Sequence, residues 1–235
     1  MTSVGMLLYP GVTQLDLAGA YEVLARLPDT RVTLVAAAPD AEATPAVRSE
    51  FGLTLIADEP FLPASQFDVL VVPGGPGVNQ LLDDDRFLDC LAHVAEGAEW
   101  ITAVCTGALL LGAAGLLRGY RATTHWQCLD MLALVGATPV AERVVVDRNR
   151  VTGAGVTAGI DFGLTLAAEL RGRDVAERIQ LLMEYAPAPP FDAGSPRTAE
   201  PHIVRQIVAE RAELIAQRRA SLTRRSRTDV RNREG

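Results

Sequence analysis

The chain has 235 residues, a net charge of −7 and an apolar content of 49%, which suits one large α/β domain with a sizeable core. No apolar run approaches the ~20 residues that a membrane span needs, and the N-terminus lacks the signals of a secretory leader. Residues 211–235 hold eight arginines and three acidic residues, so the other residues carry a net −12. An acidic body with a short basic end is not typical of a nucleic-acid-binding domain. We therefore expect a cytoplasmic protein that binds neither nucleic acid nor membranes.

Apolar, β-rich stretches alternate with helical patterns along the first 185 residues. This alternation predicts a mostly parallel sheet with helices on both faces. In chain order we expect a strand at 3–9, a helix at 14–27, a strand at 31–38, a hairpin arm at 51–56, a buried strand at 68–72, a helix from 83–85 to 96, a buried strand at 100–104, a helix at 106–117, a hairpin at 144–147 and 151–152, and helices at 158–170 and 175–185.

Residues 186–201 break this pattern with five prolines. We assign residues 1–185 to the α/β domain, and residues 186–220 to an extended arm and a C-terminal helix of the same domain. The Arg-rich residues 221–235 are expected to be a disordered tail. Proline favours an extended path, and Phe191 gives the arm an apolar anchor. We expect the arm to reach a second copy in a homodimer, with packing on its own protomer as the alternative.

The strongest chemical signal is Cys105, which lies where the buried strand at 100–104 meets the next predicted helix. The junction resembles a nucleophile elbow, in which a strained turn presents a nucleophile at the edge of the sheet. A thiol at a helix N-terminus is expected to have a lowered pKa. The alternative is a small buried hydrophobic residue, the common fate of a free cysteine. The other two cysteines, Cys90 and Cys128, fall on predicted helices as packing residues, and three unpaired cysteines favour neither a disulfide nor a metal site.

Pro73-Gly74-Gly75 follows another buried strand, so its carboxyl end should lie beside Cys105. The N–H groups of Gly74 and Gly75, together with that of Thr106, are expected to form a pocket resembling an oxyanion hole. The alternative is an ordinary tight turn.

Two ionisable residues are candidates for acid–base chemistry. Asp16 follows the first strand between two leucines, so it either caps the helix or faces the same pocket. His125, followed by Trp126, is the candidate general base; the alternative is a structural histidine packed under the indole ring. His93 and His202 fall on predicted helices and are expected at the surface.

Five motifs appear in the order found in one known family: Gln14-Leu15-Asp16-Leu17-Ala18-Gly19, Pro73-Gly74-Gly75, Ala103-Val104-Cys105-Thr106-Gly107, Arg121-Ala122-Thr123-Thr124-His125-Trp126 and Gly155-Val156-Thr157-Ala158-Gly159-Ile160-Asp161. Over residues 3 to about 185 they resemble the ThiJ/PfpI branch of the class I glutamine amidotransferase-like fold. The resemblance implies a flavodoxin-like three-layer α/β sandwich with a nucleophile elbow. Two subgroups share the motifs: isocyanide hydratases, and the sensor domains of AraC-type transcription regulators.

Details of the sequence favour the hydratase subgroup. The stretch after the arm is too short for the two helix-turn-helix units of such a regulator, and the arm resembles that of isocyanide hydratases. Protease-like relatives usually have Glu where this chain has Asp16, whereas isocyanide hydratases have Asp. Members with a Cys-His pair have histidine where this chain has Thr106, so His125 is not the expected base.

The resemblance implies a hydro-lyase that adds water to an isocyanide through a thioimidate on Cys105. Asp16 would move the protons and Thr106 would help to orient it. Gly74, Gly75, His125 and Trp126 would surround the substrate, with no metal or organic cofactor. The alternative is a ligand-sensing or redox-sensing domain without turnover.

Overall fold

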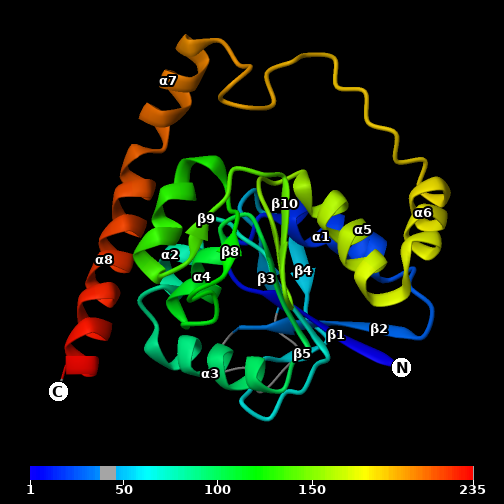
Figure 1. The fold of residues 1–235 in the computed structure, drawn as a ribbon, viewed down its shortest axis with the longest axis horizontal. Helices are drawn as coiled ribbons and strands as arrows, with labels where there is room; N and C mark the ends of the chain where they lie inside the picture. The colour runs from blue at the N-terminus through cyan, green and yellow to red at the C-terminus, as the bar shows by residue number, and fades with distance from the viewer. Residues whose placement is uncertain (38–45, 235) are drawn as a thin grey trace.

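The structure is a computed structural model that describes residues 1–37 and 46–234 (Figure 1). Its centre is a seven-stranded sheet in the order β10-β11-β7-β6-β1-β2-β5. All neighbouring strands are parallel except β10, which pairs antiparallel with β11. The strands are β1 (Thr2–Leu8), β2 (Thr30–Ala36), β5 (Glu59–Pro60), β6 (Val69–Val72), β7 (Trp100–Val104), β10 (Val144–Asp147) and β11 (Arg150–Gly153).

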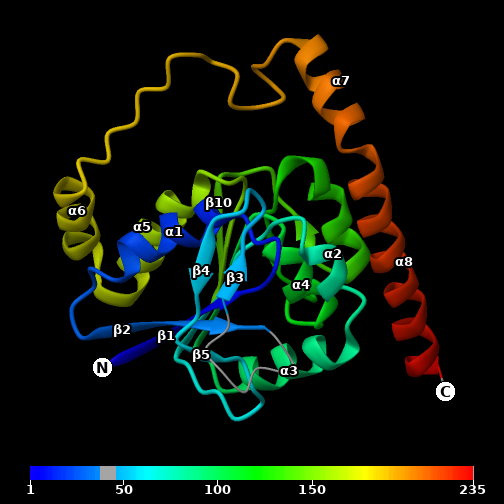
Figure 2. The same cartoon turned by 180° about the vertical axis from the view of Figure 1, so that it is seen from behind.

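Helices cover both faces of the sheet, which gives the three layers (Figures 1 and 2). Helices α1 and α5 pack together on one side, and α4 packs on β6 and β7 from the other. The helices are α1 (Gln14–Leu24), α2 (Val78–Leu81), α3 (Asp85–Glu96), α4 (Gly107–Ala113), the 3-10 helix η1 (Trp126–Val135), α5 (Ala158–Arg171), α6 (Arg173–Leu182), α7 (Pro201–Glu210) and α8 (Ala212–Glu234). The flavodoxin-like α/β architecture expected from the sequence is therefore confirmed.

The pattern of buried residues explains the order of the strands. All four residues of β6 are buried, and four of the five in β7. Strands buried on both faces read as continuous apolar runs, which is why they lie in the middle of the sheet. The carboxyl ends of the central strands β1, β6, β7 and β11 meet at one edge, and the loops that follow them carry the motif residues.

Several short elements were not expected from the sequence. The predicted hairpin arm at 51–56 is β4 (Thr54–Ile56), which pairs antiparallel with β3 (Ala46–Arg48). A second small pair joins β8 (Arg121–Ala122) to β9 (Thr138–Pro139). Strands β3, β8 and β9 were not expected, because runs of two or three residues are too short for a periodic pattern. Position 38, the predicted end of the second strand, lies outside the described residues.

The C-terminal segment differs most from expectation. The arm runs without regular structure over the body from α6 to α7 (Figures 1 and 2). Helix α8 packs on η1 and α2 of its own chain. A disordered tail was expected at 221–235; in the structure α8 continues to Glu234, and Ser221 and Leu222 are buried. A leucine at 0% exposure holds this Arg-rich stretch against the body.

None of the helices in the described part of the chain is long and apolar enough to cross a membrane.

Candidate active site

Cys105 lies on a strained turn between β7 and α4. Its φ is +55°, which costs a non-glycine residue energy and persists only where the surroundings enforce it. The turn is fixed on both sides: the Cys105 N–H donates to the Gly153 carbonyl at 2.9 Å, and the Thr124 hydroxyl donates to the Cys105 carbonyl at 2.7 Å. At Gly107, a Cβ would overlap the Val72 carbonyl, so only glycine lets α4 begin this close to β6. This is the geometry that the elbow motif predicts.

Asp16 lies beside the thiol at the start of α1. Its carboxyl group is fully buried and forms a side-chain hydrogen bond with Cys105. Burial raises the pKa of Asp16 to about 7, although hydrogen bonds from the Gly74 N–H and from Cys105 oppose the shift. The Oδ1 atom is buried without a hydrogen-bond partner in the described structure. Asp16 is therefore a buried carboxyl group whose pKa suits proton transfer near neutral pH, and it is not an exposed helix cap.

The pKa of the Cys105 thiol differs from the expectation. Burial and the neighbouring Asp16 charge raise the pKa of Cys105, and the Thr106 N–H and Arg218 only partly offset this. The lowered pKa expected from the helix terminus is thus wrong, because α4 contributes one N–H while the desolvation acts on the whole group. The Cys105 thiol therefore keeps its proton near neutral pH.

The two glycines act differently from an oxyanion hole. The Gly74 N–H donates to Asp16 Oδ2 at 2.9 Å, and the Gly75 N–H donates to Thr106 Oγ1 at 3.0 Å. Both amides, and the Thr106 N–H that serves Cys105, already have acceptors inside the protein. The expectation of a pocket resembling an oxyanion hole is therefore wrong: the two glycine N–H groups orient the side chains of Asp16 and Thr106. A Cβ at Gly74 would lie 2.5 Å from the Thr106 nitrogen, so the two turns touch only because this residue is glycine.

His125 faces the same small cavity as Cys105. Burial, Arg211 and Arg218 lower the pKa of His125 to about 4, so it is neutral near pH 7 and a weak base. Its Nδ1 accepts a hydrogen bond from the Gln127 N–H at 3.4 Å. The Trp126 ring lies 5.7 Å from the imidazole but lines a neighbouring cavity of about 550 Å³, not the one at the thiol. Of the two motif residues, His125 therefore lines both cavities and Trp126 lines only the larger one.

The cavity at Cys105 measures about 40 Å³. Its walls bring together Cys105, Thr106, Gly75 and His125 with Thr13, Glu50, Gln127, Val156, Arg211, Ile215 and Arg218. Space of this size suits a two-atom functional group rather than a whole substrate. The second cavity shares His125 and Val156 with the first and includes residues 194–197 of the arm.

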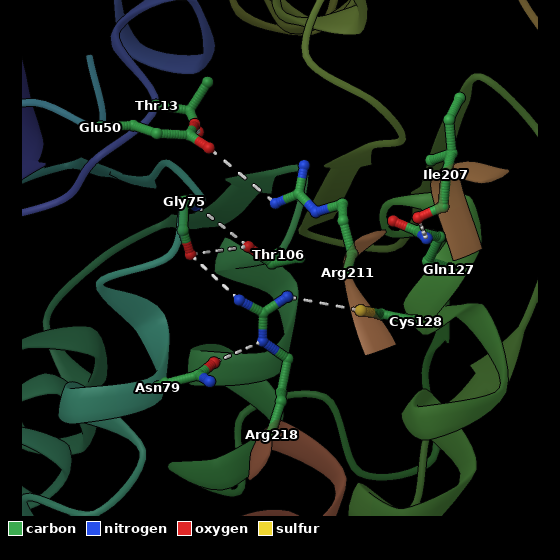
Figure 3. A network of polar contacts seen from close by, with 10 residues as sticks. All are labelled: Thr13, Glu50, Gly75, Asn79, Thr106, Gln127, Cys128, Ile207, Arg211 and Arg218. Carbon is green, nitrogen blue, oxygen red and sulfur yellow. Dashed lines mark hydrogen bonds and ion pairs between the residues drawn. The ribbon is translucent and has the colours of Figure 1, made fainter. Parts of the chain in front are cut away.

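The α7–α8 junction and helix α8 supply walls of this cavity that the sequence did not reveal. Arg211, Ile215 and Arg218 follow a spacing of four and then three residues, which places them on one face of a helix. Arg211 lies 3.9 Å from Glu50, which accepts a hydrogen bond from Thr13 at 2.8 Å (Figure 3). The spacing was visible in the sequence, but arginines at the end of a basic helix are usually solvated.

Within the described residues, no group of three or more His, Cys, Asp or Glu side chains is placed to hold a metal ion. All three cysteines are free thiols, and Cys128 accepts a hydrogen bond from Arg218 at 3.4 Å. Cys128 is thus linked to the site and is more than a packing residue.

Comparison with known proteins agrees with this geometry. The family model described as DJ-1/PfpI matches residues 2–169, which contain the elbow, Asp16 and the glycine turn. The chain belongs to the DJ-1/PfpI family. A ThiJ/PfpI family protein from Pseudomonas syringae has a similar structure, with a TM-score of 0.88 and 42% identity over 94% of this chain and 90% of that one.

Two relatives of known name differ in how much of the chain they share. The isonitrile hydratase of Pseudomonas putida is 49% identical over 97% of this chain and 93% of its own length. The HTH-type transcriptional regulator GbdR of Pseudomonas aeruginosa is 32% identical, but over only 57% of this chain and 37% of its own length. The first similarity therefore extends into the C-terminal segment, beyond the residues that the family model matches.

Proposed function

We propose that the protein is an isocyanide hydratase, an enzyme that converts R–N≡C and water into the formamide R–NH–CHO. The observation that carries the proposal is the buried Cys105–Asp16 pair, in which a thiol nucleophile touches an acid with a pKa of about 7. The 49% identity to an isonitrile hydratase over nearly the whole chain supports the same reaction.

The pair accounts for the first half of the reaction. Asp16 takes the proton of the Cys105 thiol as the sulfur attacks the terminal carbon of the isocyanide. The same proton then passes from Asp16 to that carbon, which gives the thioimidate R–N=CH–S–Cys105. A protonated resting thiol suits this addition, because the proton that leaves the sulfur is the one that the carbon needs. Covalent catalysis divides one difficult addition into two easier ones.

Water completes the reaction at the same carbon. Asp16 removes one proton from the water as its oxygen attacks, and the imine nitrogen gains a proton to give R–NH–CH(OH)–S–Cys105. The C–S bond then breaks, the hydroxyl proton leaves, and the formamide is released while the thiol is restored. We assign Thr106, Gly74 and Gly75 to holding this geometry. His125 and Val156 would lie where the isocyano group meets the larger cavity that accepts R.

Burial of the thiol counts against the sensor alternative. Redox-sensing cysteines are exposed and have a low pKa. Cys105 is 5% exposed, and burial raises its pKa.

We place the enzyme in the cytoplasm, where a reducing environment keeps such a thiol free.

Product analysis tests the proposal. Incubation with cyclohexyl isocyanide should yield N-cyclohexylformamide, and Cys105→Ala should remove the activity and leave the fold intact. Cys90→Ser is the matched control, because Cys90 lies on α3 away from the site; it should turn over normally. Activity of Cys105→Ala above a few per cent of wild type would exclude Cys105 as the nucleophile.

We further propose that the enzyme is a homodimer. Large apolar side chains are exposed on the arm, on α6 and on the β3–β4 hairpin: Phe191 at 79%, Leu181 at 82%, Leu182 at 72%, Phe51 at 78% and Ile56 at 65%. Exposed apolar groups at this density mark interaction surfaces. Light scattering at micromolar concentration should give twice the chain mass, and Phe191→Asp should lower it. A monomeric wild-type protein would exclude the dimer.

A further inference from the structure

Arg218 is a buried arginine from the C-terminal helix that ends in the catalytic cavity. Its side chain is part of the wall around Cys105, and the residue is 2% exposed. Figure 3 shows the guanidinium pointing from α8 toward the Gly75 turn. It lies outside residues 2–169, which the family model matches.

The guanidinium makes three hydrogen bonds, all to neutral acceptors. It donates to the Gly75 carbonyl at 3.1 Å, to Asn79 Oδ1 at 2.8 Å and to Cys128 Sγ at 3.4 Å. Asn79 in turn donates to the Leu214 carbonyl at 3.0 Å, which ties α2 to α8. Arg211, the other arginine in the cavity wall, differs because it lies 3.9 Å from the carboxylate of Glu50.

A buried cation is costly unless a negative charge lies nearby. The ionisable groups around Cys105 are Asp16 on α1, Tyr9 after β1, Glu50 after β3, His125 before η1, Cys128 on η1, Arg211 between α7 and α8, and Arg218 on α8. His125 is neutral near pH 7, and Glu50 pairs with Arg211. Arg218 lines the same cavity as Cys105 and acts to lower the pKa of that thiol, so the guanidinium favours a negative charge on the sulfur.

The contact at Gly75 gives Arg218 a second effect. The backbone of Gly75 is held on both sides, since its N–H donates to Thr106 Oγ1 and its carbonyl accepts from Arg218. The preceding N–H, from Gly74, orients the Asp16 carboxylate. The Arg218 guanidinium therefore holds the Gly74-Gly75 turn, which orients Asp16. Through this contact α8 becomes part of the active site.

We propose that Arg218 is a positioning residue that holds the Gly75 turn and stabilises the negative charge that Cys105 develops. This inference rests on the proposed role of Cys105 as nucleophile. It does not depend on the identity of the substrate, so it can be tested by thiol chemistry alone.

The test measures the rate of Cys105 alkylation by iodoacetamide against pH, with the modified cysteine identified by peptide mass spectrometry. Arg218→Met keeps most of the side-chain volume and removes the charge. We expect the midpoint of the profile to rise by at least one pH unit, so that alkylation at pH 7 slows about 10-fold. Arg219→Met, on the same helix but in an exposed ion pair with Asp130, is the matched control and should keep the wild-type profile.

Arg218→Lys separates the two effects. It keeps the charge, so the midpoint should stay close to that of wild type. One ammonium group cannot serve three divergent acceptors, so kcat for cyclohexyl isocyanide should fall at least 10-fold with KM little changed. Thermal melting is recorded for each variant, and Arg218→Gln, which keeps donors but no charge, replaces Met if Met does not fold. An alkylation profile of the neutral variant that superimposes on wild type would overturn the proposal, whether or not isocyanides are the substrate.

Discussion

Asp16 shows why the surroundings of a carboxyl group cannot be recognised from its residue type alone. In the sequence it is one aspartate near a helix start, where capping is the commonest role. In the structure it is fully buried, its Oδ2 accepts the Gly74 N–H, and burial raises its pKa to about 7. A general base works best with a pKa near the working pH, so the burial that is costly for folding is what suits the residue to catalysis.

We predict that Asp16→Asn lowers kcat at least 100-fold, the scale that general acid–base catalysis supplies. In the wild-type enzyme, kcat/KM should rise with pH with an apparent pKa of about 7, because Asp16 must be ionised to accept the thiol proton. The variant should lose this limb of the profile. Steady-state rates from pH 5 to 9 measure both effects, and normal turnover by the variant would reduce Asp16 to a structural residue.

His125→Ala should reduce activity less than Asp16→Asn, by about 10-fold or less. The pKa of His125 is lowered to about 4, so the imidazole neither accepts nor donates a proton efficiently near pH 7. Its loss would chiefly alter the cavity wall and the packing against Trp126. Both variants should be compared at the same pH, and a greater loss at His125 than at Asp16 would reverse the assignment.

At the scale of elements, the sequence revealed the parts that follow a strong local pattern. The buried strands β6 and β7, the elbow at Cys105 and the glycine turn were predicted because apolar runs and turn residues identify them directly. The pKa of the thiol and the use of the glycine amides were not predicted correctly. Both depend on which groups from distant elements are buried together, which no local pattern records.

Helix α8 is the clearest example of this limit. Its composition, rich in arginine, predicts a solvated or disordered segment, yet Arg218, Ser221 and Leu222 are buried on the body. Leu222 follows Arg218 by four positions, so one face of the helix carries both its apolar anchor and its contact with the cavity at Cys105. A basic helix can therefore place one buried arginine in the wall of a cavity while a neighbouring arginine, Arg219, stays exposed.

We predict that Leu222→Ala lowers the free energy of unfolding by about 2–4 kcal/mol, as expected for a fully buried leucine, and also lowers kcat. The loss of activity follows because Leu222 anchors the helix that places Arg218. Val208→Ala on α7, where the residue is 47% exposed, is the control and should change neither. Chemical denaturation and steady-state assays measure the two effects; full activity in a destabilised Leu222→Ala would separate α8 from catalysis.

At the scale of the whole molecule, the buried Asp16 makes stability depend on pH. Its pKa is raised from 3.8 to about 7, so the folded state binds more protons than the unfolded state between these values, and stability falls as pH rises through this window. Asp16→Asn should remove this dependence and stabilise the protein at pH 8 by about 1–3 kcal/mol. Denaturation at pH 5 and pH 8 tests this, and an unchanged difference between the two pH values would contradict it.

The proposed mechanism requires that the substrate becomes covalently bound to Cys105 during turnover. The most direct measurement is rapid acid quenching of the wild-type enzyme during turnover of cyclohexyl isocyanide, followed by peptide mass spectrometry. We expect a transient adduct of the full substrate mass on the peptide that contains Cys105, and none on the peptides of Cys90 or Cys128. Formation of N-cyclohexylformamide with no such adduct at any time would contradict it.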